Sequence, residues 1–117
     1  MEKINKSISV VTTVFNTKQY INELVYQIEN EVSKISDEYE IILVDDNCPQ
    51  ESWEIIEENC LRNKKIKAIK LSKNAGQQIA MSAGISKSTK DYVIILDGDL
   101  QNPINEFPTI IDYLHNG

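Results

Sequence analysis

The sequence has few of the residues that mark disulfide-rich, zinc-binding or membrane-spanning proteins. Its 117 residues include two cysteines, Cys48 and Cys60, and a single histidine, His115. No secretory signal precedes the first strand-like run, so the two thiols indicate a reduced, cytoplasmic protein with unpaired cysteines. These three residues show no recognisable zinc-ligand spacing. No apolar run approaches the length of a membrane span.

Positive charge is also in short supply. The chain carries 12 Lys and Arg against 18 Asp and Glu, a formal net charge of −6. This balance excludes proteins whose main task is to grip a nucleic-acid backbone. It also disfavours binding of an anionic substrate unless a cation bridges the two. With 41% hydrophobic and 26% charged residues, the composition is that of one compact globular domain.

Strand-like and helix-like segments alternate along the chain. β-branched, nearly continuous apolar runs predict buried strands at Ile8–Phe15 and Glu40–Asp46. Ile66–Leu71 alternates and predicts a third strand that is less buried than the others, and Tyr92–Leu96 predicts the fourth. Apolar residues at helical spacing predict four helices. The first has an inward stripe at Ile21, Leu24, Val25, Ile28, Val32 and Ile35, and the second runs over Pro49–Arg62 with Trp53, Ile56 and Cys60 inward. The third passes through Ala80, Ala83 and Gly84, and the last, after the fourth strand, has its stripe at Phe107, Ile110, Ile111 and Leu114. Asn74 and Gln77 resemble a capping box that opens the third helix.

This alternation predicts right-handed crossovers and a mostly parallel, Rossmann-like sheet with helices on both faces, a three-layer α/β/α fold. In open sheets of this class, ligands bind beyond the carboxyl ends of the strands. The predicted strand ends are polar: Phe15-Asn16-Thr17, Asp45-Asp46-Asn47, Ser72-Lys73-Asn74 and Asp97-Gly98-Asp99. One aspartate at a strand end is commonly a turn or helix cap. Two acidic ends in one sheet favour a binding edge.

The stretch Asp97-Gly98-Asp99-Leu100-Gln101 carries the most specific chemistry. Gly98 permits a tight turn between two carboxylates, and Gln101 adds an amide oxygen. Oxygen ligands suit Mg²⁺ or Mn²⁺, which complete their coordination with phosphate oxygens and water. Such an ion would let an acidic protein hold a diphosphate. The alternative is an Asp-Gly loop with solvated carboxylates.

Four segments in order, "SVVTTVFN", "EIILVDDN", "IKLSKNAGQQIAMSAG" and "DYVIILDGDLQNP", together resemble family 2 glycosyltransferases of the GT-A fold. The resemblance runs from Ser7 to Leu114. It is strongest to the branch that resembles dolichyl-phosphate mannose synthase and bacterial polyprenyl-phosphate sugar transferases. The four-part combination is far more specific than any one of its parts.

The resemblance implies roles for individual positions. Those that match the family's contacts with a nucleoside-diphosphate sugar are Thr13, Phe15, Thr17, Val44, Asp46, Lys73, Asp97, Gly98 and Asp99. Those that match its metal-binding motif are Asp97, Asp99 and Gln101. Asp46 would accept a hydrogen bond from a ring N–H of the base, whereas Asp45 looks structural. Phe15 as a core aromatic and Lys73 as a solvated loop lysine are the alternatives.

Two departures from the family pattern limit the prediction. The common first-strand motif Pro-x-Tyr-Asn-Glu is replaced by Thr13-Val14-Phe15-Asn16-Thr17, so uridine and guanosine donors are not separated. Asn102 stands where an aspartate often follows the glutamine, which weakens the expected support for the metal ligands.

The resemblance implies that residues 1–117 form the nucleotide-sugar-binding half of one glycosyltransferase domain. The family's catalytic base belongs to an acceptor-binding half beyond this span, so no catalytic residue is assigned here. The implied activity is metal-dependent, inverting transfer of a sugar from UDP or GDP to an acceptor such as a polyprenyl phosphate, by a cytoplasmic protein peripheral to the inner membrane face.

Other hypotheses remain at this point. A non-catalytic sugar-nucleotide-binding fragment is the main alternative to an active enzyme. A phosphorelay receiver domain fits less well, because a complete strand and helix precede Asp45 and because the sequence after Asp99 has no lysine for the end of a later strand. A nucleotidyltransferase would need a Gly-rich basic loop after the first strand. A sheet left partly uncovered predicts self-association through its exposed edge or face.

Overall fold

A computed structural model of the chain describes residues 3, 5–14, 21–46, 52–73 and 76–97, apart from the side chains of residues 77 and 97. The elements are β1 (Ile8–Val14), α1 (Ile21–Val32), β2 (Tyr39–Asp45), α2 (Trp53–Arg62), β3 (Ile66–Lys70), α3 (Gln77–Lys87) and β4 (Tyr92–Asp97). The four predicted strands and the first three helices are thereby confirmed to within a few residues. The predicted last helix lies outside the described residues.

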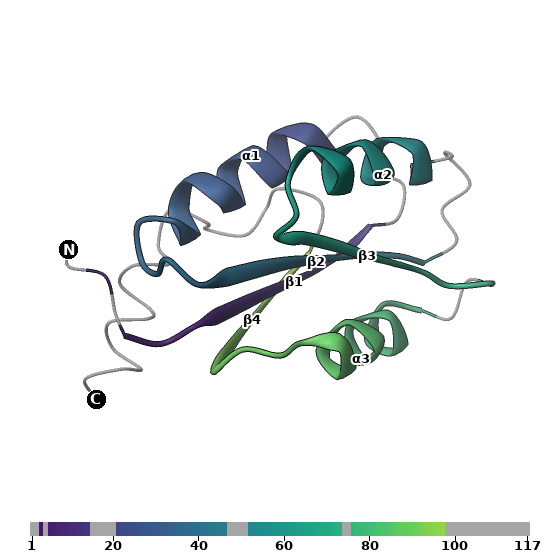
Figure 1. The fold of residues 1–117 in the computed structure, drawn as a ribbon. Coiled ribbons are helices and arrows are strands. Elements are labelled where there is room, and N and C mark those ends of the chain that lie inside the picture. Colours follow the sequence, from purple (N-terminus) through teal and green to yellow (C-terminus); the bar gives the residue numbers. More distant parts are fainter. Residues whose placement is uncertain (1–2, 4, 15–20, 47–51, 74–75, 98–117) are drawn as a thin grey trace.

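The four strands form one parallel sheet in the order β3-β2-β1-β4. Helices α1 and α2 cover one face and α3 covers the other, which gives three layers (Figure 1). This confirms the predicted α/β/α class. All seven residues of β1 are buried, as expected for a central parallel strand with helices on both sides. Strand β3 is less buried than β1 and β2, as predicted, but the described side chains of β4 are exposed to a similar extent as those of β3.

The stripe of α1 packs onto the sheet as its spacing predicts, through Ile21, Leu24, Val25, Ile28 and Val32. Its last member is placed differently. Ile35 is fully buried in the same core, but it lies in the turn after the helix, where its N–H donates to the carbonyl of Val32 (3.0 Å). The stripe of buried apolar residues therefore extends one member beyond the helix, because the turn that follows α1 places Ile35 in the same core.

The inner face of α2 combines the predicted apolar residues with a polar one. Ile56 is fully buried, and Trp53 and Cys60 pack against the core from half-buried positions. Burial raises the pKa of the Cys60 thiol, and the charge of Glu57 adds to this, which favours the protonated form of this unpaired cysteine. Asn59 is also buried, which the apolar pattern did not predict.

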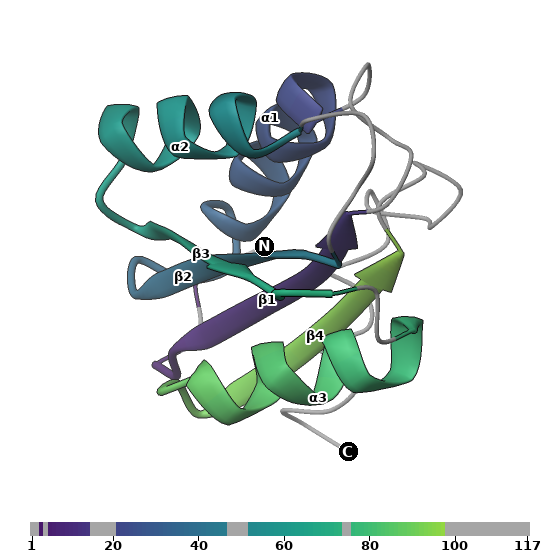
Figure 2. The ribbon, with the colours of Figure 1, turned by 90° about the vertical axis from the view of Figure 1, so that its right-hand side faces the viewer.

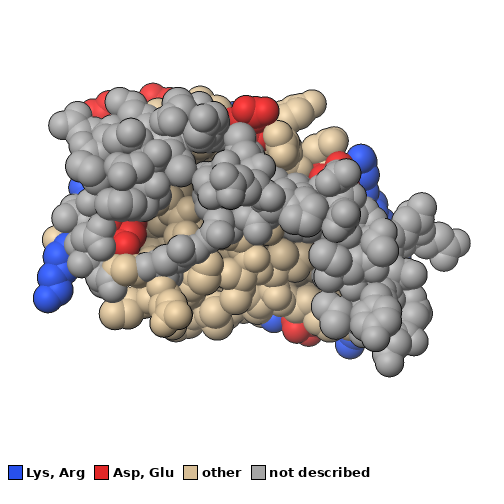
Figure 3. All heavy atoms as spheres, turned by 180° about the vertical axis from the view of Figure 1, so that it is seen from behind, with Lys and Arg blue, Asp and Glu red and all other residues tan. Residues whose placement is uncertain are grey.

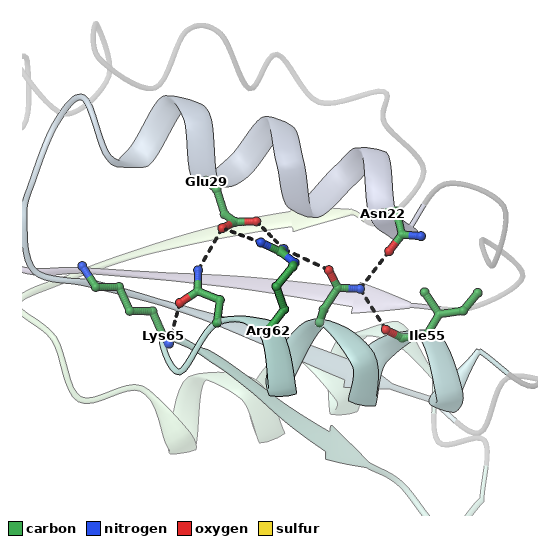
Figure 4. Close-up of polar contacts among 7 residues, drawn as sticks. Asn22, Glu29, Ile55, Arg62 and Lys65 are labelled. Carbon is green, nitrogen blue, oxygen red and sulfur yellow. Dashed lines mark hydrogen bonds and ion pairs between the residues drawn. The ribbon is translucent and has the colours of Figure 1, made fainter.

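A polar network joins α2 to α1 around Asn59 (Figure 4). The Asn59 amide donates to Asn22 Oδ1 (3.0 Å) and to the carbonyl of Ile55 (2.8 Å). One turn further on, Arg62 pairs with Glu29 (2.7 Å). A buried amide must find partners, so these bonds fix how α2 lies along α1.

The start of α3 differs from the expected capping box. The helix begins at Gln77, and the residue before it, Gly76, is the N-cap and makes no side-chain cap hydrogen bond. Gly76 has φ +95° and ψ 156°, a conformation that is essentially limited to glycine. The helix therefore begins directly after a glycine, and the side chains of the predicted Asn74–Gln77 pair lie outside the described residues.

Strand β4 is an edge of the described sheet, and one of its faces is only partly covered. Val93 and Ile95 are 40% and 42% exposed, and Ile79 and Ile85 on α3 are exposed too. Seen from behind, much of the lower described surface carries no charged side chains (Figure 3). These apolar residues are what the predicted self-association would need, and that association stays a prediction.

A buried carboxylate ties four segments together at the amino end of the sheet. Glu40 on β2, 1% exposed, accepts hydrogen bonds from Ser9 Oγ on β1 (2.6 Å), Lys67 Nζ on β3 (2.6 Å) and the N–H of Thr89 before β4 (2.8 Å). Burial alone raises the pKa of Glu40, but the donors outweigh it and lower the pKa to about 2. The ionised form is therefore the one that the fold stabilises.

Glu40→Gln should lower the free energy of unfolding at pH 7 by about 3 kcal/mol, the linkage value of the pKa difference between 4.5 and about 2. Because the folded pKa is the lower one, this stabilisation is complete above pH 4.5 and disappears as the pH falls toward 2. Urea unfolding from pH 7 to 2 measures it. Glu38→Gln, at an exposed site two residues away, is the matched control, and equal losses in both variants would contradict this account.

Candidate functional site

Three predicted site residues lie in one row across the sheet near the carboxyl ends of the strands. Thr13 on β1 is in register with Val44 on β2 and with Asp97 on β4. Figure 2 shows the ends of β1 and β4 next to each other. With strand spacings near 4.8 Å, the row from Val44 to Asp97 spans about 10 Å. The strand order thus brings together residues that are more than fifty positions apart in sequence.

The two aspartates at the end of β2 have different surroundings. Asp45, in register with Val14 and Lys70, accepts a backbone hydrogen bond at its carbonyl from Leu71 N–H (2.9 Å). The side chain of Asp46 accepts one at Oδ2 from the N–H of Gly76 (3.1 Å). The backbone of Asp45 therefore belongs to the sheet, and the side chain of Asp46 links the sheet to the start of α3.

The predicted donor-binding residues differ in exposure. Thr13 and Asp46 are 7% and 4% exposed, and Val44 is fully buried in the cluster with Val11, Ile42 and Ala80. Lys73 is exposed just after β3. The buried residues are fixed by the sheet and α3, whereas Lys73 can move toward a ligand or remain in solvent.

Several predicted residues lie outside the described part of the chain. These are Phe15, Thr17, Gly98, Asp99 and Gln101, together with the side chain of Asp97. Across the described residues, no group of three or more His, Cys, Asp or Glu side chains is placed to hold a metal. The roles assigned to these positions stay predictions.

Two residues at this edge were not identified from the sequence. Gly76 was missed because the pattern Asn-Ala-Gly-Gln pointed to Asn74 as the cap, although a glycine directly before a helix was the available signal. Lys70 has its Nζ 5.8 Å from the centre of the Trp53 ring and brings a positive charge into the row of Asp45. Only the register of β3 could show this.

The helix α3 approaches the sheet closely at Gly84. A Cβ at this position would overlap Val11 Cγ1 and lie 3.0 Å from Val44 Cγ2. Because Gly84 has no side chain, α3 can lie against β1 and β2 directly below the row of Thr13 and Val44. This close approach sets how far the N-terminus of α3, with Gly76, stands from Asp46.

Comparison with known proteins assigns the chain to a family. Residues 9–117 match the family Glycosyl transferase family 2, and the chain belongs to that family. The assignment removes the receiver domain and the nucleotidyltransferase as alternatives. The chain is 38% identical over 117 residues to undecaprenyl-phosphate 4-deoxy-4-formamido-L-arabinose transferase of Proteus mirabilis (strain HI4320), covering 99% of this chain and 36% of that protein.

Solved structures share the fold. A mannosyltransferase from Pyrobaculum calidifontis in complex with GDP-Man and Mn²⁺ superposes with a TM-score of 0.75 at 17% identity, over 88% of this chain and 30% of that one. S. aureus TarS 1-349 in complex with UDP-GlcNAc gives 0.69 at 24% identity, over 93% and 30%. The chain thus spans about a third of the length of these relatives. No described helix is long and apolar enough to cross a membrane.

Gly84→Ala should destabilise the protein by about 1–3 kcal/mol, because the added methyl group overpacks the contact of α3 with Val11 and Val44. Helix propensity alone predicts the opposite, a gain in stability of about 1 kcal/mol. The sign of the change in the free energy of unfolding therefore distinguishes overpacking from helix propensity. Thermal and urea unfolding measure it, with Ser82→Ala on the exposed side of α3 as the control. A stabilised Gly84→Ala variant would show that α3 does not rest on the sheet as described.

Proposed function

We propose that the chain is the donor-binding half of a glycosyltransferase and holds a nucleoside-diphosphate sugar at the carboxyl edge of its sheet. The observation that carries the proposal is the row of Val44, Thr13 and Asp97 on three adjacent strands, with Asp46 held beside it by Gly76. In parallel α/β sheets this edge is where ligands bind. The solved relatives named above hold GDP-Man with Mn²⁺ and UDP-GlcNAc.

The proposed cofactor is Mg²⁺ or Mn²⁺. The donors assigned to it, two carboxylates and one amide oxygen at Asp97, Asp99 and Gln101, are the oxygen ligands that these ions prefer. β4 delivers the first of them to the row at its last residue. When bound, the ion would neutralise the diphosphate and stabilise its charge as it leaves.

The roles proposed for the chain's own residues follow from their positions. Thr13 and Asp46 are held nearly rigid by burial and would bind and orient the nucleoside. Phe15 and Thr17 follow β1 and would contact the base. Lys73, exposed beyond β3, would meet the phosphates. Gly98 would let the chain approach the sugar nucleotide through its backbone.

The proposed reaction is inverting transfer of the sugar to a polyprenyl phosphate at the cytoplasmic membrane surface. The relative from Proteus mirabilis, named for undecaprenyl phosphate, supports this acceptor. The chain spans 36% of that protein. A second candidate is binding of the sugar nucleotide without transfer. In both candidate functions, we propose that residues 1–117 belong to a single domain.

Calorimetric titration of the 117-residue chain with UDP- and GDP-sugars tests the binding proposal. One of the two nucleotide sugars should bind with Mn²⁺ present. Asp99→Ala should weaken that binding by at least about tenfold, because mutation of a residue that only hydrogen-bonds to a metal ligand already lowers metal affinity by that factor. Without Mn²⁺ the wild type and the variant should bind equally weakly.

Asp37→Ala is the matched control, because Asp37 is an exposed aspartate before β2, at the opposite end of the sheet, and its loss should not alter binding. Equal Mn²⁺-dependent binding by wild type and Asp99→Ala would remove the metal role from Asp99. An assay with a short-chain polyprenyl phosphate separates the two candidates. Formation of the sugar-linked polyprenyl phosphate with release of UDP or GDP would show transfer, and its absence alongside sugar-nucleotide binding would show binding alone.

A further inference from the structure

The amino end of the sheet carries an open hollow of about 290 Å³, called here the amino-end hollow. Four of the chain's 12 Lys and Arg residues line it: Lys64, Lys65, Lys67 and Lys90. The first three lie at the start of β3 and directly before it, and Lys90 lies shortly before β4. Two segments that are far apart in the sequence thus bring positive charge to one place in an acidic protein.

The buried carboxylate of Glu40 holds these two segments together. It accepts hydrogen bonds from Lys67 Nζ on β3 (2.6 Å) and from the N–H of Thr89 (2.8 Å), the residue directly before Lys90. Glu40 is 1% exposed, so its charge is satisfied inside the protein. The core thereby sets where the ammonium group of Lys67 and the backbone next to Lys90 lie.

Lys65 is fixed at both its backbone and its side chain. Its N–H donates to Asn63 Oδ1 (2.9 Å; Figure 4), and its carbonyl accepts from the N–H of Ile41 on β2 (2.9 Å). Its Nζ donates to the carbonyl of Asp37 (2.8 Å) and lies 4.1 Å from the centre of the Tyr39 ring. Because an ammonium group has three donors, Lys65 keeps further donors for a ligand although its position is set.

Lys64 and Lys90 have no ion-pair partner among the residues that the structure describes. Lys64 is exposed, but Lys90 is half-buried. Asp91, directly after Lys90, is engaged elsewhere, because its carboxylate accepts hydrogen bonds from the N–H and the hydroxyl of Ser7 (3.0 and 3.1 Å). Partial burial of an ammonium group without a counter-charge is unfavourable, and a bound anion would supply that charge.

The carboxylates that line the amino-end hollow do not balance its lysines. They belong to Asp37, Glu38 and Glu40, and Asp37 is paired with Lys3 from outside the lining. With Lys3 counted, five ammonium groups stand against three carboxylates, an excess of two positive charges in a chain with a net charge of −6. A phosphate monoester carries a charge of about −1.5 to −2 at pH 7, which matches this excess.

We propose that the amino-end hollow binds a phosphate-type anion, at a site separate from the proposed sugar-nucleotide site. Lysines bind phosphate as point charges, and the volume of about 290 Å³ is close to the lower end of small-molecule pockets. The seven residues of β2 separate the two sites by about 20 Å. A free phosphate group and an anionic lipid head group share this chemistry, and the site does not depend on the proposed function.

Titration of the 117-residue chain with inorganic phosphate, followed by ¹H–¹⁵N NMR at constant ionic strength, tests the site. The proteins are the wild type, Lys64→Gln, the double variant Lys64→Gln/Lys90→Gln and a control, Lys34→Gln/Lys87→Gln. The control removes the same charge from two exposed lysines outside the amino-end hollow. A second arm uses vesicles of phosphatidylglycerol or phosphatidylcholine at the same phosphate concentration. Circular dichroism reports the fold of each protein separately.

Phosphate should shift the amide signals of residues 64–67 and 89–90 saturably in the wild type. The Lys64→Gln/Lys90→Gln variant should bind at least about tenfold more weakly, because two charge-assisted contacts are lost, and Lys64→Gln alone should give a smaller loss. The control should change binding by less than about twofold, since salt screens charges that are not in contact. Phosphatidylglycerol vesicles that bind through the same two lysines would identify a lipid head group as the source, and binding of free phosphate alone would identify a soluble anion.

Three results would overturn the inference: shifts that do not saturate, equal losses in the two double variants, or binding of neither phosphate nor vesicles. Sugar-nucleotide binding with Mn²⁺ should be the same in the wild type and in Lys64→Gln/Lys90→Gln. A loss confined to that variant would show that the two sites are not separate and would overturn this inference as well. No sugar-nucleotide binding by either protein would overturn the proposed function and leave the phosphate result to decide this inference alone.

Discussion

The parallel pairing of β1 with a strand on each side is the constraint on which the rest of the structure depends. Because β1 lies between β2 and β4 in fixed register, the ends of three strands meet at one edge. A shift of one residue in either pairing would turn the partner's side chains to the opposite face. The buried β-branched residues of β1 oppose such a shift, since both of its faces are packed.

The two ends of this sheet serve different purposes. At the amino end, Glu40 has donors from Ser9, Lys67 and Thr89, so a buried charge is fully satisfied by the protein itself and acts as a structural tie. At the carboxyl end, aspartates follow β2 and β4 in the sequence, and the proposed site depends on them.

The helix α3 connects the core to the proposed site. Gly84 lets it lie directly on Val11 and Val44, and Gly76 begins it beside Asp46. A packing change at one glycine would therefore shift a hydrogen-bond donor at the other, about two turns away along the same rigid element. Two glycines with different physical roles, close approach and positive φ, place one helix relative to one carboxylate.

The sequence by itself determined the four strands, the first three helices, the α/β/α class and the family, because the period of the apolar residues and the four motifs are local signals. It did not determine the strand order, the end of α1 before Ile35, the buried Asn59 or the glycine start of α3. Those depend on which segments share a space and which donors need a partner there. The row of Val44, Thr13 and Asp97, and the bond from Gly76 to Asp46, exist only once the strands have paired, since the distance between residues far apart in sequence is a property of packing.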